Sequence, residues 1–163
     1  MSILPVVTGD RVFVTTFIEV FCLAADLDKI HWQGPEMDGI HGTPVVQDGV
    51  VFVNSGGFQE IAPQPRAFAV ADGTEQWTYE TGAVSKSTPA VANGRVFIGT
   101  ADGLHAVDAS TGDQLYTIPE ASNPWGTPAA TDDRAFIVSE NEELLAIDAT
   151  TGAIEWRTAS RDG

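Results

Sequence analysis

The stretch Ala146-Ile-Asp148-Ala-Thr-Thr-Gly152-Ala-Ile-Glu-Trp156 decides how this chain folds. It predicts a short strand, a tight turn and a second strand that ends at an aromatic residue. A near copy, Ala-Val-Asp-Ala-Ser-Thr-Gly-Asp-Gln-Leu-Tyr, occupies residues 106–116. Weaker copies end at Trp77 and Trp32. The chain therefore contains four copies of the same unit.

Each copy is preceded by two further predicted strands. The first begins at a proline, a polar turn with Asn-Gly or Asp-Gly character follows, and the second strand is centred on a phenylalanine. Repetition at about 40 residues, with four strands per unit, is typical of propeller blades. The marker residues recur at steps of 39, 45 and 39 positions: Pro5, Pro44, Pro89 and Pro128, and Phe13, Phe52, Phe97 and Phe136.

We therefore expect an all-β fold, a β-propeller of four-stranded antiparallel blades, in a single domain spanning 1–163. Its four blades are expected near 1–34, 42–80, 87–119 and 126–159. The longer middle step falls in the loop 54–66, which contains Phe58. Long loops on rigid scaffolds often carry function, although a tolerated surface insertion is the plainer explanation.

The chain is strongly acidic: 23 Asp and Glu against 8 Lys and Arg give a net charge of -15. Binding to nucleic acid or to an anionic membrane surface needs clustered cations, and the sequence has no basic patch. Three explanations of the acid excess are open. Scarce lysine favours adaptation to high salt, where screening weakens the repulsion between carboxylates. The others are an ordinary acidic protein and a dedicated cation-binding surface.

No apolar run reaches the roughly 20 residues that span a membrane, and the first residues lack the pattern of a signal peptide. We expect no membrane insertion. As it stands the chain is expected to be cytoplasmic, or extracytoplasmic if it is cut from a longer exported protein. The single cysteine, Cys22, excludes an internal disulfide, and its apolar neighbours predict a buried small side chain.

The repeated pattern Ala-x-Asp-x-x-x-Gly-x-x-x-Trp resembles the tryptophan-docking motif of quinoprotein-type β-propellers, the pyrroloquinoline quinone (PQQ)-like repeat. Residues 146–156 match throughout, and residues 106–116 match with tyrosine at the tryptophan position. Repeat two aligns through Ala69, Gly73 and Trp77, with a turn that this alignment makes two residues shorter. Repeat one keeps Asp26 and Trp32 and has Asp28 in place of the glycine.

In this family the aromatic ring docks between adjacent blades, so the resemblance implies a structural role and no contact with quinone. Glycine permits the turn, the aspartate accepts backbone N–H bonds there, and the ring buries a large apolar face. The expected docking residues are Trp32, Trp77, Ala106, Asp108, Gly112, Tyr116, Ala146, Asp148, Gly152 and Trp156.

Quinoprotein dehydrogenases resemble an eight-bladed ring with quinone and calcium on its axis, a disulfide between adjacent cysteines and a catalytic aspartate. This chain has no adjacent cysteines and half the blades. No position matches the calcium ligands or the catalytic aspartate, so we assign no catalytic or metal residue. Catalysis by this chain alone is not expected, and PQQ with calcium enters only if the chain is part of a dehydrogenase.

Candidate ligand or interface residues lie where the repeats differ. Trp125 is outside the docking positions and directly precedes a first strand, where propeller loops can face the central axis. Phe58 lies in the 54–66 loop. The acidic loop with Glu140, Glu142 and Glu143 could hold a hard cation loosely, although a solvated loop is the plainer explanation. His105 is expected to be an ordinary strand side chain.

An arc of four blades leaves two apolar blade faces open, and patches of that size are rarely exposed. Three solutions remain: part of a longer propeller, a homodimer that closes an eight-bladed ring, or a tight four-bladed ring. The function most consistent with these features is a non-catalytic protein-binding or scaffold propeller. The alternatives are the propeller part of a quinoprotein dehydrogenase and a glycan-binding cell-surface module.

Overall fold

The computed structural model describes residues 4–56 and 64–158, which form four antiparallel sheets of four strands each. In every sheet the strands lie side by side in chain order. The described part also contains one turn of 3-10 helix, η1 (Pro119–Ala121), and no helix in it is long and apolar enough to cross a membrane. The fold expected from the repeats, an all-β propeller of four-stranded blades, is confirmed.

The strands are short, and their bounds repeat from blade to blade. Blade 1 contains β1 (Val6–Thr8), β2 (Arg11–Thr15), β3 (Val20–Ala24) and β4 (Ile30–Gln33). Blade 2 contains β5 (Val45–Gln47), β6 (Val50–Val53), β7 (Arg66–Ala69) and β8 (Glu75–Thr78). Blade 3 contains β9 (Ala90–Ala92), β10 (Arg95–Thr100), β11 (Gly103–Asp108) and β12 (Gln114–Ile118). Blade 4 contains β13 (Ala129–Ala130), β14 (Arg134–Val138), β15 (Leu144–Asp148) and β16 (Ile154–Arg157).

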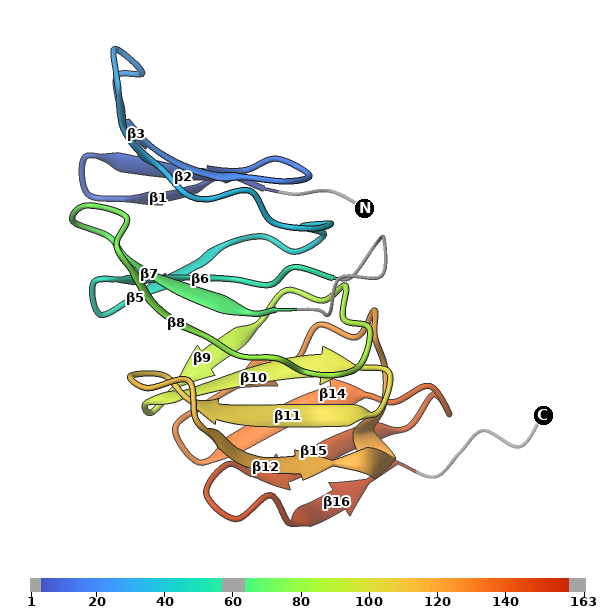
Figure 1. The fold of residues 1–163 in the computed structure, drawn as a ribbon. Coiled ribbons are helices and arrows are strands. Elements are labelled where there is room, and N and C mark those ends of the chain that lie inside the picture. Colours follow the sequence, from blue (N-terminus) through green and yellow to red (C-terminus); the bar gives the residue numbers. More distant parts are fainter. Residues whose placement is uncertain (1–3, 57–63, 159–163) are drawn as a thin grey trace.

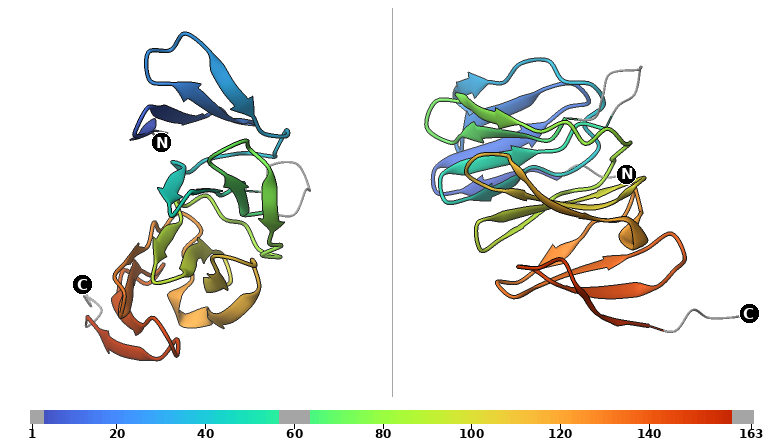
Figure 2. Two further views of the ribbon diagram at one scale, coloured as in Figure 1. Left: turned by 90° about the vertical axis from the view of Figure 1, so that its left-hand side faces the viewer. Right: turned by 60° about the horizontal axis from the view of Figure 1, so that its bottom comes forward.

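The four blades follow one another along an arc, from the blue first blade to the red fourth blade (Figure 1, Figure 2). The first strands β1, β5, β9 and β13 approach each other in succession and form the inner side of the arc. The fourth strands are the outermost members of their sheets. Connections between blades therefore run from an outer strand back to an inner one, and they gather at one end of the molecule.

The core consists of three clusters, one in each space between neighbouring blades. Period-2 alternation makes this possible, because successive residues of a strand face opposite neighbours. In β10, Val96 and Ile98 pack toward blade 2 while Phe97 packs toward blade 4. The phenylalanine position is buried in the first three blades, whereas Phe136 of blade 4 is only partly buried. Each blade thus depends on the next one to cover its apolar face.

The strand register corrects the alignment of the second repeat. Trp77 pairs with Ala67, as Tyr116 pairs with Ala106 and Trp156 with Ala146. Ala69 consequently occupies the aspartate position, and the turn of blade 2 has the same length as the others. The alignment was wrong by two residues because alanine occurs at both positions of β7. Cys22 pairs with Trp32 in the same way, so Ala24 occupies the aspartate position of blade 1 and the assignment of Asp26 to it was wrong.

The threonine of the Thr-Pro pair joins successive inner strands. The backbone N–H of Leu4 donates to Oγ1 of Thr43 at 3.2 Å, that of Thr43 to Oγ1 of Thr88 at 3.0 Å, and that of Thr88 to Oγ1 of Thr127 at 3.4 Å. Each hydroxyl therefore serves the preceding blade. The proline of this pair was expected to mark the start of a strand. The hydrogen bond that the threonine hydroxyl accepts from the preceding blade was not predicted from the sequence.

Salt is expected to stabilise this fold. Arg66, Arg134 and Arg157 each pair with a single carboxylate, so the arginines neutralise few of the 23 acidic residues. Raising the salt concentration from about 0.1 M to about 1 M shortens the screening length from about 10 Å to about 3 Å, which weakens the repulsion between carboxylates. We predict a higher melting temperature in 1 M KCl by calorimetry; equal melting temperatures at the two concentrations would remove adaptation to salt as the explanation of the composition.

Candidate interaction site

Aromatic residues of the fourth strands lie on the turn that joins the third and fourth strands of the following blade. Nε1 of Trp32 donates to the carbonyl of Val70 at 3.0 Å, and Nε1 of Trp77 donates to that of Ala109 at 2.9 Å. The hydroxyl of Tyr116 donates to the carbonyl of Ala149 at 2.6 Å. Tyrosine thus reaches the same backbone acceptor as the tryptophans, through its hydroxyl group.

Glycine lets the ring lie flat on each turn. A Cβ atom on Gly112 would lie 2.7 Å from Cδ2 of Trp77, and one on Gly73 would lie 2.7 Å from Cδ2 of Trp32. Gly112 also has a φ of +76°, which disfavours any residue with a Cβ. Trp156 differs from the other rings: its side chain is 53% exposed, because the structure holds no blade beyond the fourth.

The aspartates of these turns are held in their charged form. Asp108 accepts hydrogen bonds from the backbone N–H groups of Ser110 at 2.8 Å and Thr111 at 3.1 Å. The hydroxyl of Ser110, followed by these N–H groups, keeps the pKa of Asp108 below its ordinary value. The matching residue of blade 4, Asp148, has a lowered pKa for the same kind of reason, led by the N–H of Thr151.

Replacing Asp108 with alanine is expected to cost stability only where the carboxylate is charged. A folded-state pKa below the unfolded value of about 3.9 means that this stabilisation is complete above that pH and is lost as the pH falls through the folded value. The difference in unfolding free energy between the wild type and Asp108→Ala should therefore be constant from about pH 5 to 7 and shrink toward pH 2. Urea titrations across this range measure it, and a difference that grows toward low pH would contradict the assignment.

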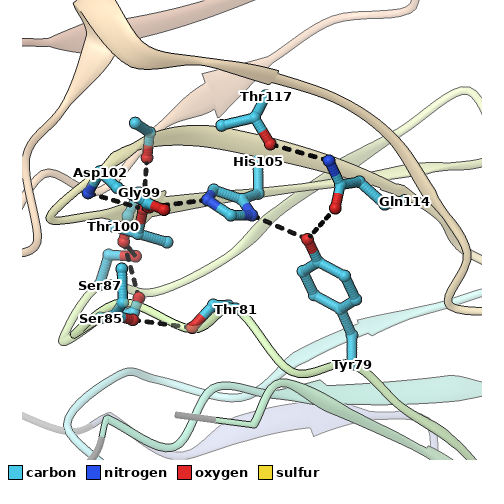
Figure 3. A network of polar contacts seen from close by, with 12 residues as sticks. Tyr79, Thr81, Ser85, Ser87, Gly99, Thr100, Asp102, His105, Gln114 and Thr117 are labelled. Carbon is cyan, nitrogen blue, oxygen red and sulfur yellow. Dashed lines mark hydrogen bonds and ion pairs between the residues drawn. The ribbon is translucent and has the colours of Figure 1, made fainter. Parts of the chain in front are cut away.

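A second polar feature, shown in Figure 3, joins blades 2 and 3 around His105. Nδ1 of His105 lies 2.8 Å from the hydroxyl of Tyr79, and Nε2 lies 2.8 Å from Oδ1 of Asp102. Burial raises the pKa of Asp102, but hydrogen bonds from Thr100 and His105 outweigh it and lower the pKa overall. Burial, with the charge of Asp102, raises the pKa of Tyr79, which keeps its hydroxyl protonated.

The histidine ring is itself 5% exposed, and the Tyr79 hydroxyl also donates to Oε1 of Gln114 at 2.9 Å (Figure 3). Every polar group in this network thus has a partner inside the molecule. His105 therefore ties the segment after β8 to strands β11 and β12. This arrangement supports a structural role between the blades and leaves the ring inaccessible to a ligand.

An exposed aromatic cluster forms where the connections between blades meet. It consists of Phe17 from the β2–β3 loop, His41 between β4 and β5, Lys86 between β8 and β9, and Trp125 between β12 and β13; we call it the Trp125 cluster. His41, Lys86 and Trp125 each lie two residues before the threonine of a Thr-Pro pair. The blade repeat therefore brings three equivalent positions together, although they lie far apart in the sequence.

Trp125 is the centre of this cluster. Its side chain is 60% exposed, Nζ of Lys86 lies 4.5 Å from the centroid of its ring, and the ring of His41 lies 6.4 Å away. Phe17 meets His41 edge-on at 5.5 Å. Two hydrogen bonds fix the loop, from Trp125 N–H to Oδ1 of Asn123 at 3.1 Å and from Lys86 N–H to the carbonyl of Pro124 at 2.7 Å.

The cluster carries unused polar groups. Burial lowers the pKa of His41, and the positive charge of Lys86 lowers it further; the negative charge of Asp38 acts in the opposite direction but is outweighed. The imidazole is therefore neutral at pH 7. Nε2 of His41 is buried and has no hydrogen-bond partner in the described part of the chain. No carboxylate among the described residues forms an ion pair with Lys86. Within the described part of the chain, Lys86 therefore presents an ammonium without a carboxylate partner, over the exposed indole of Trp125.

The acidic candidate residues lie outside this cluster. Phe58 lies outside the described residues. Glu140, Glu142 and Glu143 lie at the turn between β14 and β15, where Glu143 pairs with Arg157 at 3.7 Å. Within residues 4–56 and 64–158, no group of three or more His, Cys, Asp or Glu side chains is arranged to hold a metal ion. The place of Trp125 before a first strand predicts that it can face the axis. The prediction does not include Lys86 and His41, although they precede their Thr-Pro pairs by the same two residues.

The fold and the docked rings define an arc of propeller blades with exposed connecting loops. The family model described as outer membrane protein assembly factor BamB, a PQQ-like repeat model, matches residues 1–87 and 66–163. Together the two matches cover the whole chain. The chain belongs to this family of PQQ-like propeller repeats, as its docking motif indicated.

The individual relatives differ in the function that their names state: one is a hydroxylase and the other is an assembly factor. The chain is 27% identical to lupanine 17-hydroxylase [cytochrome c] of a Pseudomonas species, over 96% of this chain and 26% of the relative. It is 25% identical to BamB of Moranella endobia, over 91% of this chain and 42% of the relative. It therefore spans less than half the length of both proteins.

Among solved structures, a quinohemoprotein alcohol dehydrogenase from Pseudomonas putida superposes with a TM-score of 0.72 at 17% identity, covering 94% of this chain and 33% of the enzyme. At that identity the likeness shows the fold alone. The shared fold is compatible with an assembly factor and with an enzyme, and it does not distinguish between these two classes of protein.

Proposed function

We propose that this chain is a non-catalytic, protein-binding propeller module and that the Trp125 cluster is the centre of its contact surface. The observation that carries the proposal is an exposed tryptophan held in place beside an ammonium group that has no carboxylate partner in the described structure. Similarity to BamB of Moranella endobia, named as an assembly factor, supports the same class.

The chemistry of the cluster specifies its partner. Tryptophan is the residue type most enriched among the hot spots of protein interfaces, and its loop here is already ordered by backbone hydrogen bonds, so little ordering entropy is lost on binding. The ammonium of Lys86 can pair with a carboxylate of a partner. We infer a partner that presents an acidic side chain beside an apolar one.

A capture experiment tests this function. The tagged wild-type chain and its Trp125→Ala and Lys86→Glu variants are cross-linked in extracts of the source cells, and the captured proteins are identified by mass spectrometry. We expect at least one protein that the wild type retains and that both variants lose, because one variant removes the apolar anchor and the other reverses the local charge.

The matched control is Leu115→Ala, which removes an exposed apolar side chain from the outer strand of blade 3. It should capture the same protein as the wild type. Equal melting temperatures of all four proteins exclude unfolding as the cause of a loss. A wild-type capture profile that Trp125→Ala leaves unchanged would refute the proposed surface.

A quinone-dependent role is the second candidate, and the resemblance of the docking motif to that of quinoprotein propellers motivates it. Among the described residues, no group of three or more His, Cys, Asp or Glu side chains could hold a metal ion. We therefore assign no quinone or calcium ligand. Titration with PQQ and CaCl2 is expected to change neither the quinone absorbance nor the melting temperature. A response that Trp125→Ala abolishes would favour the dehydrogenase alternative over the protein-binding one.

A further inference from the structure

The first residue of the second strand is an arginine in three of the four blades. Arg11, Arg95 and Arg134 begin β2, β10 and β14, whereas Val50 begins β6. The strand register shows that these positions are equivalent, because each of the four residues pairs with the last residue of its third strand. Blade 2 therefore lacks a cation at a position that the repeat otherwise gives to arginine.

Arg11 shows how a guanidinium group binds across a junction between blades. Its Nη1 donates to the carbonyls of Val70 and Ala71 at 2.8 and 3.2 Å, and both belong to the turn between β7 and β8 of the next blade. The carbonyl of Val70 also accepts the indole N–H of Trp32, because a carbonyl oxygen has two lone pairs. The turn of a following blade can therefore hold a guanidinium group beside the aromatic ring.

At the junction of blades 2 and 3, where valine replaces this arginine, the structure has a hollow of about 350 Å³. Val50 forms part of its wall on blade 2, and Ala109 and Ser110 form part of its wall on blade 3. Ala109 and Ser110 follow β11 as Val70 and Ala71 follow β7, so their carbonyls correspond to the two that Arg11 binds. The hollow thus lies where the repeat would place a guanidinium group.

The lining suits both parts of an arginine side chain. Val50, Phe52 and Val91 supply apolar surface, against which the aliphatic stem of an arginine can pack. Asp48 and Asp108 supply carboxylates, and among the described residues that line the hollow none is a lysine or an arginine. A guanidinium group has several N–H donors in a fixed plane and pairs well with such oxygen acceptors.

We propose that this hollow binds the alkylguanidinium group of an arginine side chain that a partner protein presents. The bound group takes the position that Arg11 has at the preceding junction. Because the sheets are antiparallel, the turns around the hollow lie at the end of the blades opposite to the connections that carry the Trp125 cluster. Binding in the hollow is therefore independent of that cluster.

NMR titration of the isotope-labelled chain tests this site. The ligand is N-acetyl-arginine N-methylamide, whose capped ends imitate the peptide bonds of a protein, and the matched ligand is capped citrulline, which has a neutral ureido group of nearly the same size. We expect capped arginine to shift the backbone amide signals of Val50, Ala109 and Ser110. Capped citrulline should bind at least about tenfold more weakly, because it offers no cation to the carboxylates.

The Val50→Arg variant assigns the binding to the hollow. It restores the arginine of the other blades, so its own guanidinium group should occupy the hollow as Arg11 occupies the preceding junction. We expect this variant to bind capped arginine at least about tenfold more weakly than the wild type does. Its melting temperature should also be higher by at least about 2 °C.

The Asp48→Asn variant removes one carboxylate from the hollow. Asp48 has a φ of 49°, and asparagine tolerates this left-handed backbone, so the turn should keep its conformation. Affinity for capped arginine should fall about threefold. Asp132→Asn is the matched control, because it removes the same charge from the equivalent turn of blade 4; its affinity should equal that of the wild type.

Equal affinity for the two capped ligands would overturn the proposal, as would an affinity that Val50→Arg leaves unchanged. If Val50→Arg fails to fold, Asp48→Asn decides, and an affinity equal to that of Asp132→Asn would contradict the site. Free arginine, whose α-carboxylate the aspartates repel, should bind more weakly than capped arginine; tighter binding would exclude a partner protein as the source of the group. Trp125→Ala should bind capped arginine as the wild type does, which separates this result from the test of the proposed function.

Discussion

The Trp77→Ala variant is expected to lose about 3–5 kcal/mol of unfolding free energy, a large part of the roughly 5–15 kcal/mol that stabilises a typical domain. The ring is 7% exposed, packs against Phe52 at 5.9 Å between centroids and donates to the carbonyl of Ala109. Its removal leaves a cavity between blades 2 and 3. Because neighbouring blades cover each other, this junction carries much of the cooperativity of the arc.

Denaturant unfolding, followed by circular dichroism and by intrinsic fluorescence, measures this effect. The control is Trp156→Ala, which truncates the equivalent ring where no blade covers it, and it should change stability by no more than about 0.5 kcal/mol. We also expect the two probes to report separate transitions for Trp77→Ala, as the two halves of the arc uncouple. Equal costs for the two tryptophans would contradict the docking role.

The Gly112→Ala variant is expected to be nearly as damaging, although it adds a single methyl group. A left-handed backbone costs a residue with a Cβ about 1–2 kcal/mol. The new Cβ would in addition lie 2.7 Å from the ring of Trp77, and forced packing of this kind typically costs about 1–3 kcal/mol. The two effects add, because the backbone strain and the steric contact have different causes.

Gly94→Ala separates these two effects within the same blade. Gly94 has a φ of +70°, and a Cβ there would meet no atom within 4 Å, so only the backbone cost applies. Urea unfolding should therefore rank Gly112→Ala below Gly94→Ala in stability. The additional cost should disappear when Trp77 is also replaced with alanine, as a double-mutant cycle measures. A cost for Gly112→Ala that is unchanged in that background would show that the ring is not the cause.

Much of the fold could be predicted because its determinants are local and repeated. The recurrence of Phe13, Phe52 and Phe97 with turn residues between them indicates strand order, blade number and the aromatic positions without long-range information. The register of blade 2 is also contained in the spacing, because Ala67 precedes Trp77 by ten residues as Ala146 precedes Trp156. Alanine at both Ala67 and Ala69 obscures this match, and the pairing of Trp77 with Ala67 across the sheet settles it.

The candidate site was predictable to a smaller extent. Trp125 was visible as an aromatic residue outside the docking pattern, but its neighbours Lys86 and His41 come from other repeats, and their proximity depends on how the blades curve together. That the Lys86 ammonium has no carboxylate partner among the described residues depends on the three-dimensional positions of the carboxylates around it.

The decisive quantity is the dissociation constant of the captured partner for Trp125→Ala divided by its dissociation constant for the wild-type chain. Calorimetry at one salt concentration measures both. An interface anchor is worth at least about 2 kcal/mol, so the account predicts a ratio of about thirty or more. A ratio near one, with both proteins folded, would contradict the assignment of the Trp125 cluster as the binding surface.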